Sequence, residues 1–182
     1  ADEFDLTFTA DVSVPLLKDV KEQAPNAVCH KVTTNVSTNL IVNRDAPPFD
    51  NEQVRKAMAI AMDRSAFIKI LSNGENQLGG AMLPPPSGGW GMPAEVLAKA
   101  PGYGEPDEDV AKAQAMMKAA GYGPDNRLAV KVSTRNIAIY RDPAVILLDQ
   151  LKAIYIDAEL EVIESSNWHA TVARKDYQVG LN

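Results

Sequence analysis

The chain has 182 residues, of which 46% are hydrophobic and 23% are charged, and its formal net charge at pH 7 is −6. These proportions are ordinary for a globular protein and exclude a disordered or collagen-like chain. The acidic balance and the lack of a cluster of Lys or Arg argue against a nucleic-acid partner, because a phosphate-binding surface needs a basic stripe.

The single cysteine excludes an internal disulfide and a metal site rich in thiolates. We expect this residue, Cys29, to be a small buried side chain within a strand. The sequence has no run of about 18 apolar residues that could span a bilayer, and it has no signal-peptide pattern. The length suffices for one domain with a substantial core.

The first part of the chain predicts two strands with a helix between them. Residues Glu3–Ala10 alternate between apolar and polar side chains, which is typical of a half-buried strand. Residues Val14–Gln23 form a short helix in this interpretation, with Leu16, Leu17 and Val20 turned inward. A second strand is expected over Ala27–Val32.

The next segment predicts a strand, a proline turn and two helices. Leu40–Val42 is a short apolar strand, and Pro47 and Pro48 prevent the sheet or a helix from continuing. Asp50 is the expected N-cap of the first helix, and Asp63 that of a second helix that stops at Gly74. The face of the first helix that we expect to be buried contains Val54, Ala57, Met58 and Ala61.

The middle of the chain predicts a loop and then a longer helix. Residues Gly79–Pro93 are rich in proline and glycine, which is typical of a loop. Trp90 within it has either of two roles, a packing lid or a ligand contact, since its ring is flat and apolar and its indole donates a hydrogen bond. Residues Asp107–Ala120 form a capped helix that stops at Gly121.

The last third predicts strands and helices in alternation. The expected elements are a strand from Leu128 to Val132 that runs into polar residues 133–136, a helix over Pro143–Ile154 with its proline near the N-terminus, a strand over Ile156–Ile163, a short helix capped by Ser166 and a strand that begins at Tyr177. This alternation predicts parallel strands joined by right-handed crossovers. The expected fold class is therefore α/β.

One group of residues resembles a known family. The sequence has a strand that ends in Asn, a proline turn, an acidic residue, and then Val54, Arg55, Ala57, Ala61, Asp63 and Arg64. This order resembles the substrate-binding proteins of peptide-type ABC transporters, which include dipeptide-, oligopeptide- and nickel-binding proteins. Leu83–Pro85 and the helix before Gly121 and Tyr122 are similar to further segments of the same family.

The resemblance implies a lobe like that of type II periplasmic binding proteins, with a mixed, mostly parallel sheet flanked by helices. Residues 1–42 would be the end of a first lobe and hinge-crossing strands, and residues 43–182 a C-terminal α/β lobe truncated at its C-terminal end. It further implies a periplasmic protein that does not span the membrane, whose partners are a small-molecule or peptide ligand and an ABC permease. The lack of a signal peptide would then reflect processing or truncation.

Arg135 is the main candidate for ligand binding. It follows a predicted parallel strand, where open α/β sheets place their ligand crevices, and a guanidinium can hold a carboxylate by two parallel hydrogen bonds. A surface or inter-lobe salt bridge is the alternative. The resemblance implies that Arg135 contacts a ligand carboxylate, with Asn136, Tyr140 and Arg141 as its neighbours and Trp90 as a further candidate.

The chain departs from the family pattern at Tyr155, where the family has a glycine that ends a helix. A left-handed Tyr costs about 1 kcal/mol or more, so we expect this helix to end differently. The family's second anchor for a peptide, an aromatic residue with an Asp, follows the strand that begins at Tyr177 and lies outside this sequence.

We find no catalytic constellation in the sequence. The two histidines, His30 and His169, have no signature around them, and the motifs of serine hydrolases, zinc proteases and dithiol redox proteins are missing. We therefore expect no enzyme activity, no cofactor and no metal. The alternatives that stay open are a stand-alone α/β enzyme domain with an unrecognised site and a pure interaction domain. The ligand itself is open among peptides, nickel chelates, opines and oligosaccharides.

Overall fold

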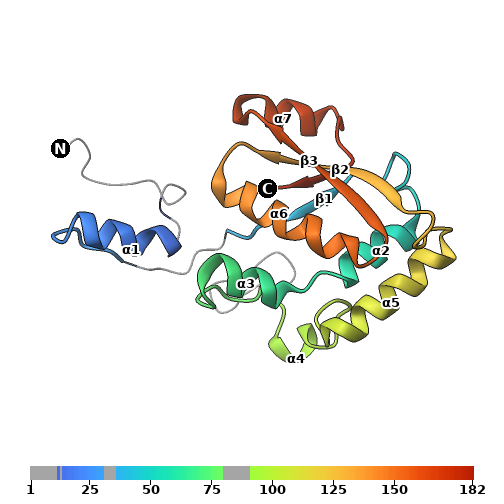
Figure 1. The fold of residues 1–182 in the computed structure, drawn as a ribbon, viewed down its shortest axis with the longest axis horizontal. Helices are drawn as coiled ribbons and strands as arrows, with labels where there is room; N and C mark the ends of the chain where they lie inside the picture. The colour runs from blue at the N-terminus through green and yellow to red at the C-terminus, as the bar shows by residue number, and fades with distance from the viewer. Residues whose placement is uncertain (1–11, 13, 31–35, 80–90) are drawn as a thin grey trace.

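The structure is a computed structural model that describes residues 12, 14–30, 36–79 and 91–182. These residues form a sheet with helices packed around it (Figure 1), which confirms the α/β class. In spatial order the strands are β1 (Leu40–Val42), β4 (Val179–Leu181), β2 (Leu128–Arg135) and β3 (Ile156–Ile163).

The sheet is mixed and mostly parallel, as predicted. β2 is parallel to β3 and to β4, whereas β1 is antiparallel to β4. Parallel neighbours need a crossover between them, and α6 and α7 supply it. The carboxyl ends of β2, β3 and β4 therefore lie at one edge of the sheet. At that edge Asn39 and Asn182 exchange two backbone hydrogen bonds of 2.7 and 3.1 Å, which extend the pairing of β1 with β4.

The helices surround this sheet unevenly. They are α1 (Val14–Gln23), α2 (Glu52–Ile60), α3 (Arg64–Ser72), α4 (Ala94–Leu97), α5 (Pro106–Ala119), α6 (Ala138–Lys152) and α7 (Ser165–Ala173). α6 packs against β2 and β3, α2 packs against α5, and α7 contacts β2. In Figure 1 α1 stands to one side of the α/β body, where α3 is its nearest helix.

The core is made by the apolar faces of the helices against the sheet. The predicted face of α2 is confirmed, because Val54, Ala57, Met58 and Ala61 are all buried. They join a cluster with Phe49 of the proline turn, Met117 of α5, Leu147 and Leu151 of α6, and Val130 and Val132 of β2. Each such side chain contributes roughly 1.5–3 kcal/mol when fully buried, so this cluster carries most of the stability.

The start of α2 lies one residue later than predicted. The N-cap is Asn51, whose side-chain oxygen accepts the amide of Gln53 at 2.9 Å. Asp50, the predicted cap, instead accepts the amide of Asn51 through Oδ1. The amides of Phe49 and Asp50 both donate to Ala46 O, so the turn after the prolines continues for one residue before the helix begins. The second cap is as predicted, since Asp63 Oδ1 accepts the amide of Ala66.

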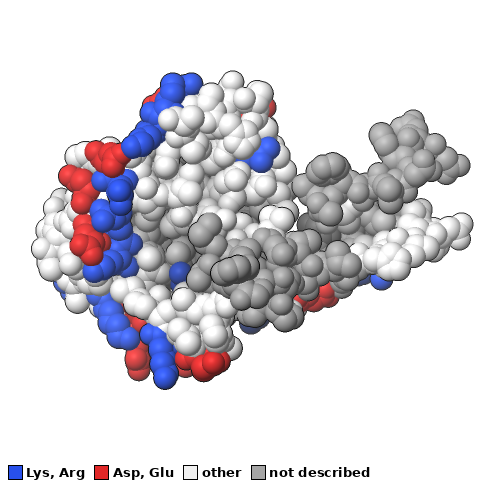
Figure 2. Space-filling model, turned by 180° about the vertical axis from the view of Figure 1, so that it is seen from behind, with Lys and Arg blue, Asp and Glu red and all other residues white. Residues whose placement is uncertain are grey.

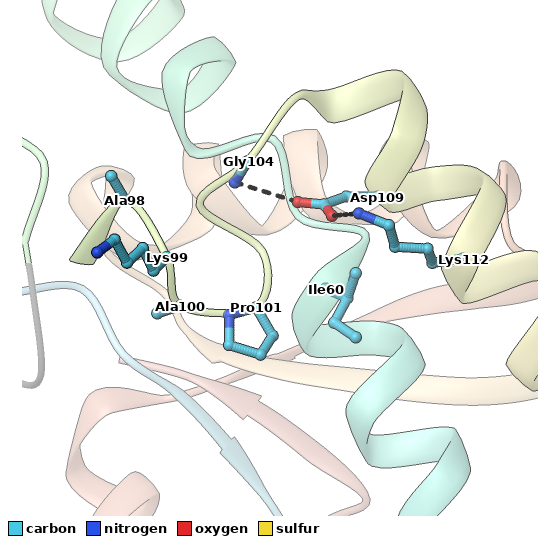
Figure 3. A pocket seen from close by; sticks show the side chains of 8 residues that line it. All are labelled: Ile60, Ala98, Lys99, Ala100, Pro101, Gly104, Asp109 and Lys112. Carbon is cyan, nitrogen blue, oxygen red and sulfur yellow. Dashed lines mark hydrogen bonds and ion pairs between the residues drawn. The ribbon is translucent and has the colours of Figure 1, made fainter. Parts of the chain in front are cut away.

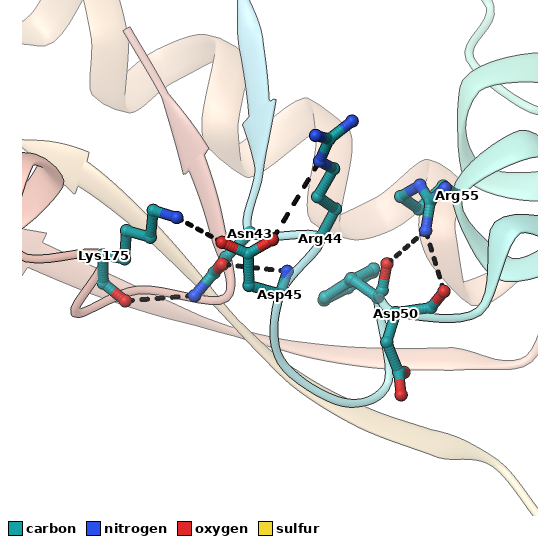
Figure 4. Close-up of polar contacts among 7 residues, drawn as sticks. Asn43, Arg44, Asp45, Asp50, Arg55 and Lys175 are labelled. Atoms are coloured by element: carbon teal, nitrogen blue, oxygen red, sulfur yellow. Dashed lines mark hydrogen bonds and ion pairs between the residues drawn. The ribbon is translucent and has the colours of Figure 1, made fainter.

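The first arginine of the family-like motif holds the proline turn in place. Arg55 Nη1 donates to the carbonyl oxygens of Phe49 and Asp50 at 2.6 and 3.0 Å (Figure 4). A guanidinium bonded to carbonyl groups in this way adds charge-assisted hydrogen bonds to the backbone bonds of the turn. Arg55 therefore serves the fold.

The second arginine ties the end of α2 to a distant loop. Arg64 Nη1 donates to Met62 O at 3.2 Å and to Gly102 O, and its guanidinium lies 4.3 Å from the ring centroid of Tyr103. Gly102 has φ 81°, and a Cβ there would lie 2.7 Å from Ala59 O. Glycine is required because both the left-handed backbone and the close approach exclude a side chain.

Asn43 joins the turn after β1 to the segment before β4 (Figure 4). Its Nδ2 donates to Lys175 O at 3.0 Å and Tyr177 O at 3.1 Å, and its Oδ1 accepts the amide of Asp45 at 3.2 Å. The residue is 8% exposed. A buried amide with these bonds satisfies backbone groups that would otherwise be unpaired.

A second long-range amide pairing joins the helices. Gln150 of α6 accepts the amide of Asp63 and donates to the carbonyl of Asp63, each at 3.1 Å. The side chain thus pairs with one backbone residue as a neighbouring strand would. This contact ties the N-terminus of α3 to α6.

Several predicted boundaries are wrong. α6 begins at Ala138 and not at Pro143, which lies inside the helix, because the tight turn after β2 lets the amides of Tyr140 and Arg141 bond to Ile137 O at once. α7 begins at Ser165 after Glu164, so Ser166 is not its cap. α5 begins at Pro106, one residue before the predicted start.

The predicted end of α6 is also wrong. Tyr155 does adopt the left-handed conformation, with φ 65°. Its ring packs against the core, and the Lys118 ammonium lies 5.8 Å from the ring centroid. Its carbonyl accepts the amide of Leu128 at 2.8 Å. We attribute the unfavourable backbone to these contacts, which offset its cost.

The N-terminal predictions fare less well. α1 has the predicted bounds, but Leu16 is 42% exposed and not turned inward. Residues 27–30 form no strand, and Cys29 among them is only half-buried. Apolar character alone does not place a segment in a sheet, since pairing partners are also needed. The predicted strand over Glu3–Ala10 and the end of Ala27–Val32 lie outside the described residues.

The corrected cap leads to a stability prediction. Asn51→Ala should lower the free energy of unfolding by about 1 kcal/mol, because it removes the side-chain acceptor of the first turn of α2. Asp50→Ala should cost less than about 0.5 kcal/mol, since Asp50 is exposed and holds one amide outside the helix. Urea unfolding of both variants measures the two losses. A larger loss for Asp50→Ala would contradict the assignment of Asn51 as the cap.

Candidate ligand-binding site

The candidate site lies where the parallel strands end. Arg135 is the last residue of β2, opposite Ile163 at the end of β3. The amide of Asn136 donates to Ile163 O at 3.0 Å and that of Ile137 donates to Arg135 O at 2.8 Å. The chain therefore turns into α6 within three residues, and Arg135 stays at the edge where ligands of open α/β sheets bind.

The guanidinium of Arg135 has an unusual environment. Its carbon Cζ lies 5.1 Å from the ring centroid of Tyr140, which is a cation–π contact. Its Nε is buried, and within the described part of the chain it has no hydrogen-bond partner. A buried donor without a partner costs roughly 1–3 kcal/mol. Arg135 therefore differs from Arg55 and Arg64, whose donors are bonded to backbone carbonyls.

The other predicted site residues are arranged as follows. Tyr140 lies under Arg135, so the structure brings these two together. Asn136 is adjacent, but its Nδ2 donates to Glu164 Oε1 at 3.2 Å. Arg141 Nε lies 3.8 Å from Asp142 Oδ1, and both side chains are largely exposed. Trp90 lies outside the described residues.

A residue that the sequence analysis did not identify also belongs to this edge. Asn182 follows Leu181, which is opposite Thr134 in the pairing of β4 with β2. Its Oδ1 is buried, and among residues 12, 14–30, 36–79 and 91–182 nothing donates a hydrogen bond to it. No sequence signal marks Asn182, since only the strand register places it beside Arg135.

The carboxyl groups with perturbed pKa values lie elsewhere. A hydrogen bond from the Lys175 ammonium holds the pKa of the Asp45 carboxyl below its usual value, and a bond from Lys56 does the same for the pKa of Glu52. Asp45 follows the end of β1 that pairs with the start of β4, whereas Arg135 lies beyond the pairing of β2 with the end of β4. Figure 4 shows Asp45 beside Lys175. Such shifts are typical of exposed ion pairs and give no sign of proton transfer at the candidate site.

The rest of the surface gives two further observations. On the face shown in Figure 2, basic and acidic side chains gather next to one another along one margin. That margin therefore has neither a purely positive nor a purely negative patch. Within the described ranges no group of three His, Cys, Asp or Glu side chains could hold a metal ion. None of the helices in those ranges is long and apolar enough to cross a membrane.

A hollow of about 380 Å³ between the end of α2, the loop after α4 and the start of α5 is a second place for a ligand. Its walls include Ile60, Pro101 and Asp109 (Figure 3). Asp109 is its buried charged group, but both carboxylate oxygens are in use, with the Gly104 amide at 3.3 Å and Lys112 Nζ at 3.2 Å. This hollow therefore lacks the unsatisfied polar atoms that Arg135 and Asn182 supply.

The family of the chain follows from a match over nearly its whole length. Residues 4–182 match the family described as "Bacterial extracellular solute-binding proteins, family 5 Middle". The chain belongs to this family. The family is one of binding proteins, which favours a binding role over the alternative of an enzyme domain. Proteins called "Glutathione-binding protein GsiB" from Salmonella choleraesuis (strain SC-B67) and Salmonella typhimurium (strain LT2) are each 28% identical to it over 134 residues, which are 74% of this chain. The chain spans about a quarter, 24%, of the length of these relatives.

Solved structures agree with the fold of a periplasmic binding protein. The periplasmic binding protein DppA from Helicobacter pylori, in complex with the peptide STSA, gives a TM-score of 0.74 at 22% identity over 93% of this chain and 31% of that one. The Escherichia coli murein tripeptide binding protein MppA gives a TM-score of 0.73 at 16% identity, over 93% of this chain and 33% of MppA. NikA from Brucella suis, in complex with Fe(III)-EDTA, gives a TM-score of 0.66 at 17% identity, over 94% of this chain and 34% of NikA. At these identities the likeness establishes the fold alone.

The contrast between the arginines yields a prediction about stability. Arg64→Ala should lower the free energy of unfolding by about 1.5–3 kcal/mol, because it removes charge-assisted bonds to partly buried backbone carbonyls. Arg135→Ala should change it by less than about 1 kcal/mol, since the loss of the Tyr140 contact is offset by the loss of an unsatisfied buried donor. Urea unfolding measures the free energy of each variant, and the two values can be compared if the free energy falls with urea concentration at the same slope in both. If Arg135→Ala proved the more damaging change, Arg135 would be a structural residue.

Proposed function

We propose that this chain forms one wall of the binding cleft of a periplasmic protein that captures carboxylate-bearing solutes, peptides foremost, and delivers them to the permease of an ABC importer. The observation that carries the proposal is the Arg135 guanidinium, whose Nε is buried and has no hydrogen-bond partner within the described chain. Family membership supports the transport role.

The proposal includes a division of the chain. Residues 1–42 are the end of a first lobe with hinge-crossing strands, and residues 43–182 belong to the second lobe. Since the chain spans 24% of the length of the GsiB relatives, we propose that the facing wall of the cleft comes from sequence outside these residues. A ligand held from both sides shifts the equilibrium between open and closed lobes, and the permease recognises the closed form.

The choice of a carboxylate rests on chemistry. Guanidinium presents donors in a planar fork that fits both oxygens of a carboxylate, and the ring of Tyr140 holds that fork at the end of β2. The names of the related proteins support the class, because peptides, glutathione and EDTA all carry carboxylates. Neutral sugars offer no such group.

The first test uses the full-length protein that carries this chain. Arg135→Ala should weaken binding of a tripeptide acid such as trialanine about tenfold to a hundredfold, because a charge-assisted hydrogen bond contributes about 1.5–3 kcal/mol. Arg135→Lys should also weaken it, since an ammonium cannot form two parallel bonds. Isothermal titration calorimetry measures each affinity.

The matched control is trialanine with its carboxylate amidated. The parent and Arg135→Ala should bind this amide about equally weakly, because the group that Arg135 holds is missing. An equal loss for the acid and the amide on Arg135→Ala would show that Arg135 is not the anchor.

The isolated chain provides a second test. Residues 1–182 alone should bind trialanine or glutathione much more weakly than micromolar, because one exposed wall leaves a ligand largely solvated. The same titration should give tighter binding to the full-length protein. Micromolar affinity of the isolated chain for either ligand would contradict a cleft formed by two lobes.

A further inference from the structure

We propose that Asn73 is a site of spontaneous deamidation, which the fold keeps closed and which opens when the C-terminal turn of α3 unravels. The reaction needs no enzyme and no ligand, so this inference is independent of the proposed function. Its reactants are the side-chain amide of Asn73, the backbone amide of Gly74 and water. Its products are ammonia and either aspartate or isoaspartate.

The sequence supplies the reactive pair. Asn73 is followed by Gly74, and this is the only Asn-Gly step among the 182 residues. In the reaction the Gly74 nitrogen attacks the side-chain carbon Cγ of Asn73. Glycine favours this attack, because it has no side chain beside the nitrogen and restricts the backbone least. Both residues are exposed, so water reaches them.

The bonds and protons of the reaction balance. The Gly74 nitrogen gives its proton to hydroxide and forms a bond to Cγ of Asn73. The bond between Cγ and Nδ2 breaks, and Nδ2 takes a proton from water and leaves as ammonia. Water then opens the resulting cyclic imide at Cγ, which gives aspartate, or at the backbone carbonyl carbon, which gives isoaspartate. No oxidant or reductant takes part.

The conformation of Asn73 keeps the two reacting atoms apart. Asn73 is the C-cap of α3 and is left-handed, with φ 53° and ψ 30°. At this ψ the Gly74 nitrogen lies nearly opposite Cβ of Asn73 across the bond between Cα and the carbonyl carbon. Ring closure needs the nitrogen and Cβ on the same side of that bond. Asn adopts the left-handed cap more readily than most residues, so the unreactive conformation is the favoured one.

Hydrogen bonds hold the turn in this conformation. The carbonyl oxygen of Ile68 accepts three of them, from the amide of Asn73, from the amide of Gly74 at 3.1 Å and from Ser72 Oγ at 2.7 Å. Ser72 Oγ also accepts the amide of Asn76 at 2.9 Å, and Ser72 is fully buried. The attacking nitrogen is therefore itself bonded to the helix, and Ser72 joins the turn to the residues that follow it.

The rate of deamidation therefore measures how often this turn opens. The native rate equals the rate in the unfolded chain multiplied by the open fraction of the turn. Breaking the three bonds to Ile68 O leaves an open fraction of about one tenth to one thousandth. Either product adds a negative charge at the C-terminus of α3, where the helix dipole disfavours it. Deamidation thus weakens the cap that had prevented it.

The experiment follows Asn73 in the full-length protein in mildly alkaline buffer. The proteins are the parent, Ser72→Ala and, as a matched control, Ser65→Ala. Ser65 is a serine at the opposite end of α3, and its Oγ donates to Asp63 Oδ1 at 2.6 Å. Each protein is incubated folded and also unfolded in guanidinium chloride. Peptide mapping by mass spectrometry locates each amide that has become a carboxyl group, and urea unfolding checks that the variants fold.

Asn73 of the folded parent should react about tenfold to a thousandfold more slowly than Asn73 of the unfolded parent. For each variant the folded rate is divided by its own unfolded rate, which removes any effect of the substitution on the reaction itself. Ser72→Ala should raise this ratio about threefold to tenfold, because it removes one bond to Ile68 O. Ser65→Ala should keep the ratio of the parent.

Three results would overturn the inference. If Asn73 stayed intact in the unfolded chain, it would not be a deamidation site. If it reacted equally fast in the folded and unfolded parent, the turn would not protect it. If Ser72→Ala and Ser65→Ala raised the ratio equally, overall stability and not this turn would control the reaction.

Discussion

The parallel pairing of β2 with β3 and β4 is the constraint on which the candidate site depends. It brings the carboxyl ends of the three strands to one edge, so that residues far apart in sequence, Arg135 and Asn182, become neighbours. The antiparallel strand β1 closes this edge through the two hydrogen bonds between Asn39 and Asn182. Without this pairing the two unsatisfied atoms would have no relation to each other.

The unsatisfied polar atoms of the site lower the stability of the fold, and the hydrophobic core offsets this loss. Two unsatisfied buried atoms cost roughly 1–3 kcal/mol each, which is comparable to the burial of one or two core side chains. The core supplies many such contributions. The hydrogen bonds from Arg55 and Arg64 satisfy backbone carbonyl oxygens that would otherwise lose their partners. Arginine therefore has two roles here, and they are distinguished by whether its donors already have partners.

Close packing explains the strained and restricted positions of the chain. A Cβ on Gly180 in β4 would lie 2.8 Å from the side chain of Ile41 and 3.2 Å from that of Trp168, so a larger residue in the middle of this strand would require these side chains to shift. Tyr155 tolerates a left-handed backbone because its ring and its carbonyl both find partners. In both places residues distant in sequence determine the local structure: the space for a side chain at position 180 and the backbone conformation at Tyr155.

The sequence by itself determined the elements whose signal is local. The apolar face of α2, the cap at Asp63, the alternation of β2 and the bounds of β3 all follow from periodicity and hydrogen-bonding residues near in the chain, and these predictions are confirmed. The order of residue types around Arg55 and Arg64 also predicted the family. The alternation of β2 predicted that Arg135 follows a parallel strand, and the structure makes it the last residue of that strand. Only the tertiary structure decided the start of α6, the conformation of Tyr155 and the absence of a strand at residues 27–30. It alone placed Asn182 beside Arg135, because strand register and the satisfaction of buried polar atoms depend on which distant segments pair, and a single strand does not specify its partner.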